Sequence, residues 1–196
     1  MGKGRFEAFS DGVLAIIITI MVLELKVPHG ESLEAIAPLL PVFLSYVLSF
    51  VYIGIYWNNH HHLMQAAKSV SGRVLWANMH LLFWLSLLPF TTGWMGENHF
   101  ARLPMVVYGL NLLMSGLAYF ILQLQLVAHH GPGSAIQQAL GRDLKGKSSL
   151  VIYVLGTLAA WFAEPWMGFV AFTGVACMCV VPDRRMEAAV RKHYAG

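Results

Sequence analysis

The stretch that decides the fold reads RFEAFSDGVLAIIITIMVL and runs from Arg5 to Leu23. From Val13 onward it is almost wholly apolar, and roughly 20 such residues can cross the hydrocarbon core of a bilayer as a helix. Asp11 stands directly beside this apolar run, where an ionised group needs a partner or water. The stretch therefore predicts a membrane helix that borders an aqueous path, or one that polar contacts hold to its neighbours.

The composition of the chain agrees with a membrane setting. Its 196 residues are 57% hydrophobic and 12% charged, whereas a soluble domain carries about 25% charged residues. The two cysteines, Cys177 and Cys179, lie in an apolar run and lack the spacing of a zinc site or of a comfortable disulfide. We interpret them as packing residues and predict no metal site and no cofactor.

Six apolar segments are candidates for membrane helices. They predict an all-α, polytopic membrane protein that forms a single domain over residues 1–196. Pro89 predicts a kink in the third segment, and the short fifth and sixth segments predict a tight helical hairpin. The predicted helices cover Phe6–Leu25, Leu33–Trp57, Gly72–Met95, Leu103–Ala128, Ser148–Ala163 and Pro165–Val181, with a short interfacial helix at Ala135–Leu144.

The positive charges divide unequally between the two sides that six spans define. Lys26 and Arg102 fall on one side, and the other eleven of the 13 Lys and Arg residues fall on the side of both termini. The positive-inside rule therefore predicts cytoplasmic termini and a place in the cell membrane. A basic rim beside anionic lipid explains these charges, so no nucleic-acid partner is predicted. The eleven are Lys3, Arg5, Lys68, Arg73, Arg142, Lys145, Lys147, Arg184, Arg185, Arg191 and Lys192.

One face of the first helix carries a stripe of bulky apolar residues. Placed at about 100° per residue, the stripe contains Phe9, Ile16, Ile20, Leu23 and Val27, with Thr19 beside it. If several copies of the helix surround an axis, these residues form stacked apolar rings, which can set the narrowest diameter of a pore and gate it by dewetting. The alternative is that the stripe packs against another helix, because apolar stripes are common.

Polar residues of three helices are predicted to meet near the cytoplasmic side of the membrane. Ser10 and Asp11 belong to the first helix, the run 57–62 ends the second, and the run 76–80 lies near the start of the third. A buried carboxylate beside His and Asn donors can be satisfied. We predict a network of Ser10 and Asp11 with His60 and Asn78, capped by Trp57 and Trp76, that fixes the rotation of the first helix.

The consecutive histidines His60, His61 and His62 invite a metal interpretation. On a helix they point roughly 100° apart and cannot all bind one ion, so a metal site is disfavoured. A proton relay stays open, because histidine titrates near neutral pH. The chain contains no Walker loop, dinucleotide fingerprint, His-Glu-x-x-His or Gly-x-Ser-x-Gly motif, which argues against an enzyme.

The residues Arg5-x-x-x-Phe9-Ser10-Asp11 resemble the signature of the transmembrane protein 175 family of potassium channels. The similarity covers roughly the first half of the chain, and the second half agrees mainly in hydropathy and span count. Further matching residues follow in the expected order, namely Gly12–Ile20, Leu23–Pro28, Trp57-x-x-His60, Asn78 and Pro89-Phe90.

The resemblance implies the bacterial form of the family, with one six-helix unit per chain and a homotetramer whose pore is lined by helix one. Its implied function is a potassium-selective channel with a hydrophobic constriction at Ile16, with Ile20 and Leu23 beyond it, in place of a carbonyl selectivity filter. Thr19 matches a position whose hydroxyl is implicated in favouring potassium. The pair Ser10-Asp11 is implied to contact the His and Asn of helices two and three.

The resemblance also implies the partners, which are the other copies of the chain, the permeant potassium ion and the lipid bilayer. Two alternative functions stay open. One is a proton pathway through the same helix that uses Asp11 and His60. The other is a structural membrane protein that transports no ion.

Overall fold

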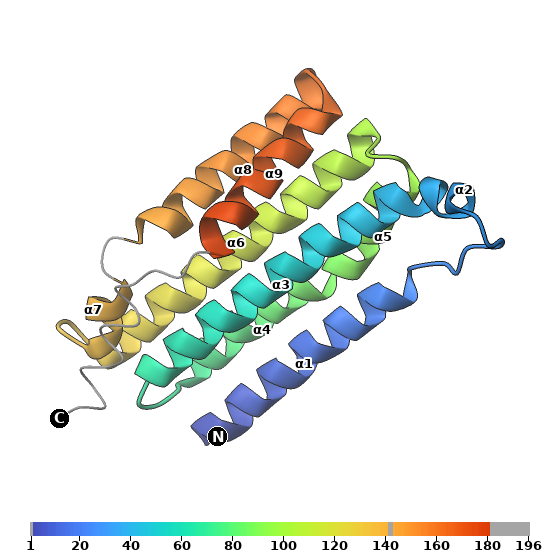
Figure 1. The fold of residues 1–196 in the computed structure, drawn as a ribbon. Helices are drawn as coiled ribbons and strands as arrows, with labels where there is room; N and C mark the ends of the chain where they lie inside the picture. The colour runs from blue at the N-terminus through green and yellow to red at the C-terminus, as the bar shows by residue number, and fades with distance from the viewer. Residues whose placement is uncertain (1, 141–142, 181–196) are drawn as a thin grey trace.

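The computed structural model describes residues 2–140 and 143–180, which form a bundle of roughly parallel helical rods (Figure 1). Every regular element in these two ranges is helical, so the predicted all-α fold is confirmed. The elements are α1 (Lys3–Leu23), α2 (Leu33–Ile36), η1 (Ala37–Leu39), α3 (Leu40–Ala66), α4 (Gly72–Ser86), α5 (Leu88–Glu97), α6 (Arg102–His130), α7 (Ala135–Leu140), α8 (Leu144–Phe162) and α9 (Pro165–Val180).

The elements group into the six membrane segments that the sequence predicts. Four stretches are long and apolar enough to cross a membrane, namely Lys3–Leu23, Leu33–Ala66, Gly72–Glu97 and Arg102–His130. The remaining two segments are α8 and α9, which are shorter and pack against each other as the predicted hairpin. Each begins with a residue that favours a helix N-terminus. Asp143 caps α8 by accepting a hydrogen bond from the Gly146 N–H, and Pro165 is the first residue of α9.

The observed helix ends differ most from the prediction around the second segment. α3 continues to Ala66, nine residues beyond the predicted end at Trp57, so the whole polar run 57–62 is helical. α1 ends at Leu23, which leaves Val27 beyond the helix and outside its apolar stripe. Parts of the predictions lie outside the described residues, namely Val181 and the basic residues Arg142, Arg184, Arg185, Arg191 and Lys192.

The third segment breaks beside Pro89, as predicted. α4 ends at Ser86 and α5 begins at Leu88, because proline lacks an N–H and its ring disfavours a continuous helix. Asn111 of α6 supplies hydrogen-bond partners for backbone groups at this break. With its amide suitably turned, the nitrogen donates to the Trp84 carbonyl (2.9 Å) and the oxygen accepts from the Leu88 N–H (3.3 Å).

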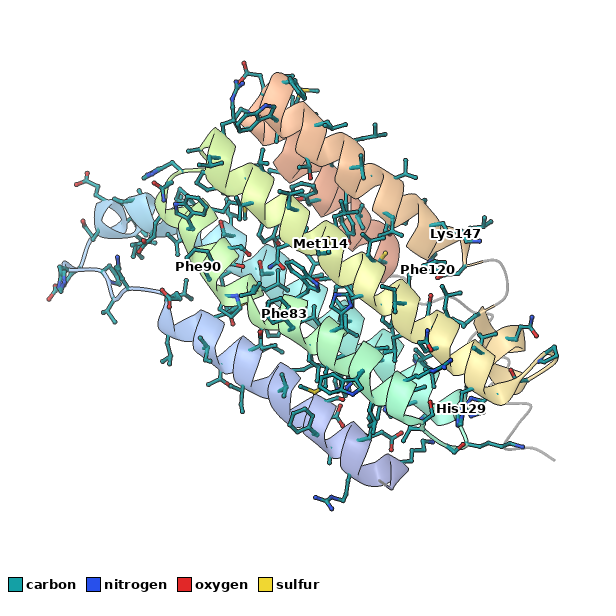
Figure 2. All side chains as sticks on the ribbon, turned by 180° about the vertical axis from the view of Figure 1, so that it is seen from behind. Phe83, Phe90, Met114, Phe120, His129 and Lys147 are labelled. Carbon is teal, nitrogen blue, oxygen red and sulfur yellow. The ribbon has the colours of Figure 1, made fainter. Side chains whose placement is uncertain are left out.

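α1 lies at one edge of the bundle, against α3, α4 and α5, whereas α6 runs between α4 and α8 (Figure 1). Phe83 and Phe90 mark the exposed side of the α4–α5 rod next to α1 (Figure 2). The described part of the chain therefore covers one side of α1. Its buried residues follow the spacing of one helix face and are Phe6, Ser10, Leu14, Ile17 and Met21.

Gly96 lets α5 approach the start of α3 closely. A Cβ atom added to Gly96 would lie 2.7 Å from the Cα of Val42, and this backbone cannot move aside as a flexible side chain can. We expect Gly96→Ala to lower the free energy of unfolding by about 1–3 kcal/mol. In the matched variant Gly54→Ala the added carbon meets nothing within 4 Å, so no loss is expected. Thermal unfolding in detergent compares them, and equal midpoints would contradict the close approach.

Candidate functional site

A chain of buried hydrogen bonds joins α1 to α4 and α3. Asn78 Nδ2 donates to Ser10 Oγ (2.9 Å), and the Ser10 hydroxyl donates to the Phe6 carbonyl (3.0 Å). His60 Nε2 lies 2.9 Å from Asn78 Oδ1. Because the Asn78 oxygen can only accept, His60 must donate in this pair. Each of these three side chains is thus paired, although all three are at most 3% exposed.

Phe6 adds an aromatic contact to the same place. Its ring stacks on His60, with centroids 6.0 Å apart and an interplanar angle of 22°. Phe6 precedes Ser10 by four residues, so the two side chains lie on one face of α1. The sequence prediction did not include Phe6, although this spacing from Ser10 was the signal that could have found it. Together Phe6 and Ser10 are the anchor of α1.

Of the predicted network, Asp11 contacts Trp57 rather than His60 or Asn78. Its carboxylate is exposed in the single chain and accepts a hydrogen bond from Trp57 Nε1 at 3.1 Å. Adjacent helical residues differ by about 100° in direction, so burial of Ser10 turns Asp11 to the flank of α1. The direct contact from α1 to Asn78 is therefore made by Ser10 rather than by Asp11.

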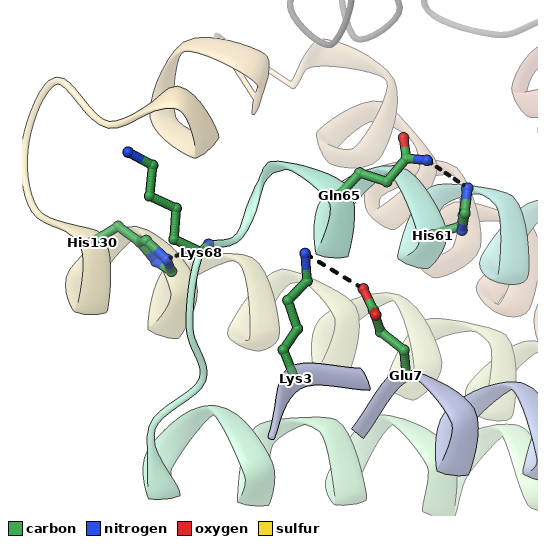
Figure 3. Close-up of polar contacts among 6 residues, drawn as sticks. All are labelled: Lys3, Glu7, His61, Gln65, Lys68 and His130. Carbon is green, nitrogen blue, oxygen red and sulfur yellow. Dashed lines mark hydrogen bonds and ion pairs between the residues drawn. The ribbon is translucent and has the colours of Figure 1, made fainter. Parts of the chain in front are cut away.

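The two tryptophans predicted as caps behave differently. Trp57 stacks on His61, with ring centroids 5.9 Å apart, and His61 Nε2 lies 2.9 Å from Gln65 Nε2 (Figure 3). Trp76 is 78% exposed and points away from the buried chain. Of the adjacent histidines, His60 is buried and bonded to Asn78, whereas His61 is exposed.

The uncovered face of α1 carries the predicted stripe. Ile16, Ile20 and Leu23 are 60%, 43% and 76% exposed, and Phe9 and Arg5 are exposed on the same side. Such exposure is unusual for three bulky apolar residues on one soluble surface and indicates contact with lipid, another chain or a pore. One face of α1 is thus anchored and the opposite face is free.

Thr19 borders this free face and is exposed. Its hydroxyl donates to the Ala15 carbonyl at 2.8 Å, so the proton is used within the helix. The lone pairs of the oxygen stay available to a ligand or to water. Thr19 therefore adds an acceptor oxygen to a face that is otherwise apolar.

A cavity of about 620 Å³ separates α1 from α5. Ile16 and Ile20 line it from α1, and the stacked rings of Phe90 and Trp94 line it from α5. Beyond it, Lys26 Nζ pairs with Glu97 Oε1 at 2.6 Å and joins the loop after α1 to the end of α5. The hydrogen bond from Lys26 and the negative charge of Glu97 raise the pKa of the Lys26 ammonium.

The chemistry of this site is that of a surface rather than a reactive centre. In the part of the chain that the structure describes, no three His, Cys, Asp or Glu side chains are grouped so that they could hold a metal ion. The free face of α1 offers apolar bulk and one hydroxyl oxygen. Such a face can narrow and dry an aqueous path, but it cannot replace the hydration shell of an ion.

Comparisons with known proteins place these features in context. A family model described as endosomal/lysosomal potassium channel TMEM175 matches residues 5–89. A potassium channel from Chryseobacterium sp. (strain P1-3) is 51% identical over 193 residues, which is 98% of this chain and 100% of that relative. The endosomal/lysosomal proton channel TMEM175 of Gallus gallus is 43% identical over 75 residues, which is 32% of this chain and 15% of that protein.

A solved structure with a similar fold extends the comparison. It is the crystal structure of a lysosomal potassium-selective channel TMEM175 homolog from Chamaesiphon minutus. The two chains superpose with a TM-score of 0.78 at 26% identity, over 91% of this chain and 96% of the other. The similarity therefore extends to the second half of the molecule, which the family model does not match.

Proposed function

Because this chain belongs to the TMEM175 family of channels, we propose that it is a potassium-selective cation channel of the cell membrane. The Chryseobacterium relative is named a potassium channel, and the Chamaesiphon homolog is titled potassium-selective. The whole chain, residues 1–196, then acts as one channel domain, with no catalytic activity. The observation that carries the proposal is the free apolar face of α1, opposite an anchored face.

The free face of α1 would line the pore. Four copies around an axis would bring Ile16, Ile20 and Leu23 into stacked apolar rings, with Ile16 as the constriction. Support comes from the exposure of these three side chains in the single chain and from the edge position of α1 in the bundle. A homotetramer would cover apolar surface that the single chain leaves bare.

The anchored face would fix the rotation of α1 about its own axis, and with it the direction in which the apolar side chains of the rings point. Ser10 is bonded to Asn78, and Phe6 is stacked on His60, so rotation of α1 would break buried contacts. A turn of one residue changes the direction of a helical side chain by about 100°. The family signature residues Arg5, Phe9, Ser10 and Asp11 would therefore act by positioning, with Trp57, His60 and Asn78 as their support.

Selectivity would arise without a carbonyl filter. An apolar ring supplies no coordinating oxygen, so an ion must shed part of its hydration shell to pass, and potassium sheds water more readily than smaller cations. The Thr19 oxygen, one turn beyond Ile16, is the acceptor that could compensate part of this loss. Both termini would face the cytoplasm, as the positive-inside rule predicts.

Reconstitution into liposomes tests the proposal. Purified protein should carry potassium flux down a gradient, faster than sodium flux under matched gradients and without an energy source. Protein-free liposomes and liposomes with heat-denatured protein are the controls. Absence of potassium flux from protein shown to be folded and tetrameric would contradict the proposal and favour a structural membrane protein.

A proton pathway is the second candidate, because the Gallus gallus relative is named a proton channel and Asp11 is exposed on α1. Asp11→Asn separates the two functions. The amide can still accept from Trp57 Nε1, but it carries no titratable proton. We expect potassium flux to stay within about threefold of wild type, a change below 1 kcal/mol.

The matched control for this variant is Glu7→Gln, which neutralises the partly exposed carboxylate that pairs with Lys3 at 3.7 Å on the same helix (Figure 3). Proton flux is measured in the same liposomes with a pH-sensitive dye. Loss of proton flux in Asp11→Asn, with Glu7→Gln unchanged and no potassium flux in either protein, would favour the proton pathway over the potassium channel.

A further inference from the structure

We propose that His130 forms a pH-sensitive latch between the end of α6 and the linker that joins α3 to α4, residues 67–71. Its imidazole accepts a hydrogen bond from the backbone of this linker (Figure 3). Protonation of that imidazole nitrogen breaks this hydrogen bond and loosens the linker at Lys68. The inference goes beyond ion conduction, because it concerns how one end of the bundle responds to acid.

The hydrogen bonds of His130 assign both of its ring nitrogens. The Lys68 N–H donates to His130 Nε2 at 3.1 Å, so this nitrogen carries no proton. The other nitrogen, Nδ1, lies 2.9 Å from the Leu126 carbonyl and must be the donor. The imidazole is therefore neutral in this arrangement. If Nε2 gained a proton, two N–H donors would face each other, one from Lys68 and one from His130, and the hydrogen bond between them would be lost.

His129, the preceding residue, is a natural contrast. Its Nε2 lies 3.0 Å from the Ser69 hydroxyl, on the same linker. A hydroxyl can donate to a neutral imidazole or accept from a protonated one by rotating about its C–O bond. Protonation of His129 therefore preserves its contact, whereas protonation of His130 breaks one. The acid response is assigned to His130 alone.

Within residues 2–140 and 143–180, few ionisable residues neighbour His130. His129 stands next to it, with ring centroids 5.0 Å apart. The linker carries Lys68, α4 begins with Gly72 and Arg73, and the neighbouring α7 has no ionisable residue. The C-terminal end of α6 favours a positive charge, and the nearby basic residues oppose it.

The linker is well placed to pass on the change. It leads from α3, which carries His60, to α4, which carries Asn78. Ser71 at its end caps α4 by accepting from the Val74 N–H at 3.4 Å. Without the bond from Lys68 to His130, the end of α3 and the start of α4 are held less firmly. These are the two helices that bind the anchor of α1. In the orientation proposed above, this end lies on the cytoplasmic side.

Hydrogen–deuterium exchange of the Lys68 amide, read by mass spectrometry on the reconstituted protein, tests the latch. Protection is expressed relative to the intrinsic exchange rate at each pH. Between about pH 7.5 and about pH 5.5 we expect protection to fall severalfold, with a ceiling of about tenfold per pH unit for one proton. Unchanged wild-type protection over this range would overturn the proposal.

Three variants identify the group that titrates. His130→Gln offers an amide oxygen near the Nε2 position that does not titrate, so the acid-induced loss should disappear. His130→Leu has no acceptor and should show low protection at both pH values. His129→Gln should lose protection on acidification like wild type. An undiminished loss in His130→Gln, or its disappearance in His129→Gln, would overturn the proposal. This readout needs no ion flux, so failure of the proposed channel function would leave it decisive.

Discussion

Ile16→Asn is expected to raise the ion flux of the reconstituted protein by about tenfold or more and to lower its preference for potassium over sodium. An apolar ring at the constriction keeps water out, and an ion must lose hydration to pass it. The smaller amide side chain of asparagine binds water and removes part of that barrier. A barrier lower by about 1.4 kcal/mol is enough for a tenfold increase.

Leu155→Asn is the matched control for this prediction. Leu155 lies on α8 and is 59% exposed, against 60% for Ile16 on α1. Both variants place an amide on an exposed apolar surface, but only one lies on the proposed pore face. Flux and selectivity are measured in the same liposome assay. Equal effects of the two variants, or no effect of either, would contradict the assignment of Ile16 to the constriction.

Asn78→Leu is expected to lower the free energy of unfolding by about 2–4 kcal/mol, because two buried polar groups each lose a hydrogen bond, at about 1–3 kcal/mol each. Those groups are the Ser10 oxygen and the His60 Nε2 proton, which lie 2.9 Å from the two ends of the Asn78 amide. Leucine has the same branching and is larger than asparagine, so the substitution leaves no cavity and the effect reports the lost hydrogen bonds. Loss of the tetramer and of flux should accompany it.

Thermal unfolding and size-exclusion chromatography in detergent measure this second prediction. Asn58→Leu is the control, since Asn58 is partly exposed on α3 at a similar depth. The double variant Ser10→Ala with Asn78→Leu should lose less than the sum of the two single losses, because the partners share one bond. A small effect of Asn78→Leu, equal to that of Asn58→Leu, would contradict the anchoring role of the buried chain.

The helical architecture was predictable because each span is decided by a long local run. Apolar length fixed the existence of the six segments, and the missing N–H of Pro89 fixed the break in the third. Helix ends were less predictable. The run 57–62 is polar, yet it contains no helix breaker, and α3 continues through it until Ala67 becomes extended.

Only part of the anchor could be predicted from the sequence, for a geometric reason. The pattern identified Ser10 and Asp11 together, but neighbouring residues on a helix point about 100° apart, and α1 at the edge of the bundle buries Ser10 and leaves Asp11 exposed. The observed choice of Ser10 depends on where α3 and α4 lie. The same packing buries Phe6 and leaves Trp76 exposed. The sequence pattern of α1 or α4 alone does not predict which of these side chains is buried.

The role of the apolar stripe is a different problem. A stripe that lines a pore and one that packs on a helix have the same spacing, so sequence alone left both open. The fold narrows the choice, since the rest of the chain covers the opposite face of α1 and leaves Ile16 and Leu23 exposed. What these residues meet depends on the assembly, because the four copies together would form the path.

An experimental structure of the protein in lipid nanodiscs is the most direct test of the central claim that α1 lines the pore. The account predicts a fourfold symmetric assembly in which the four α1 helices surround the axis. The Ile16 side chains should come closest to the axis, and the Ser10–Asn78 contact should persist in every copy. An assembly in which the Ile16 face of α1 meets lipid, or in which another helix surrounds the axis, would contradict it.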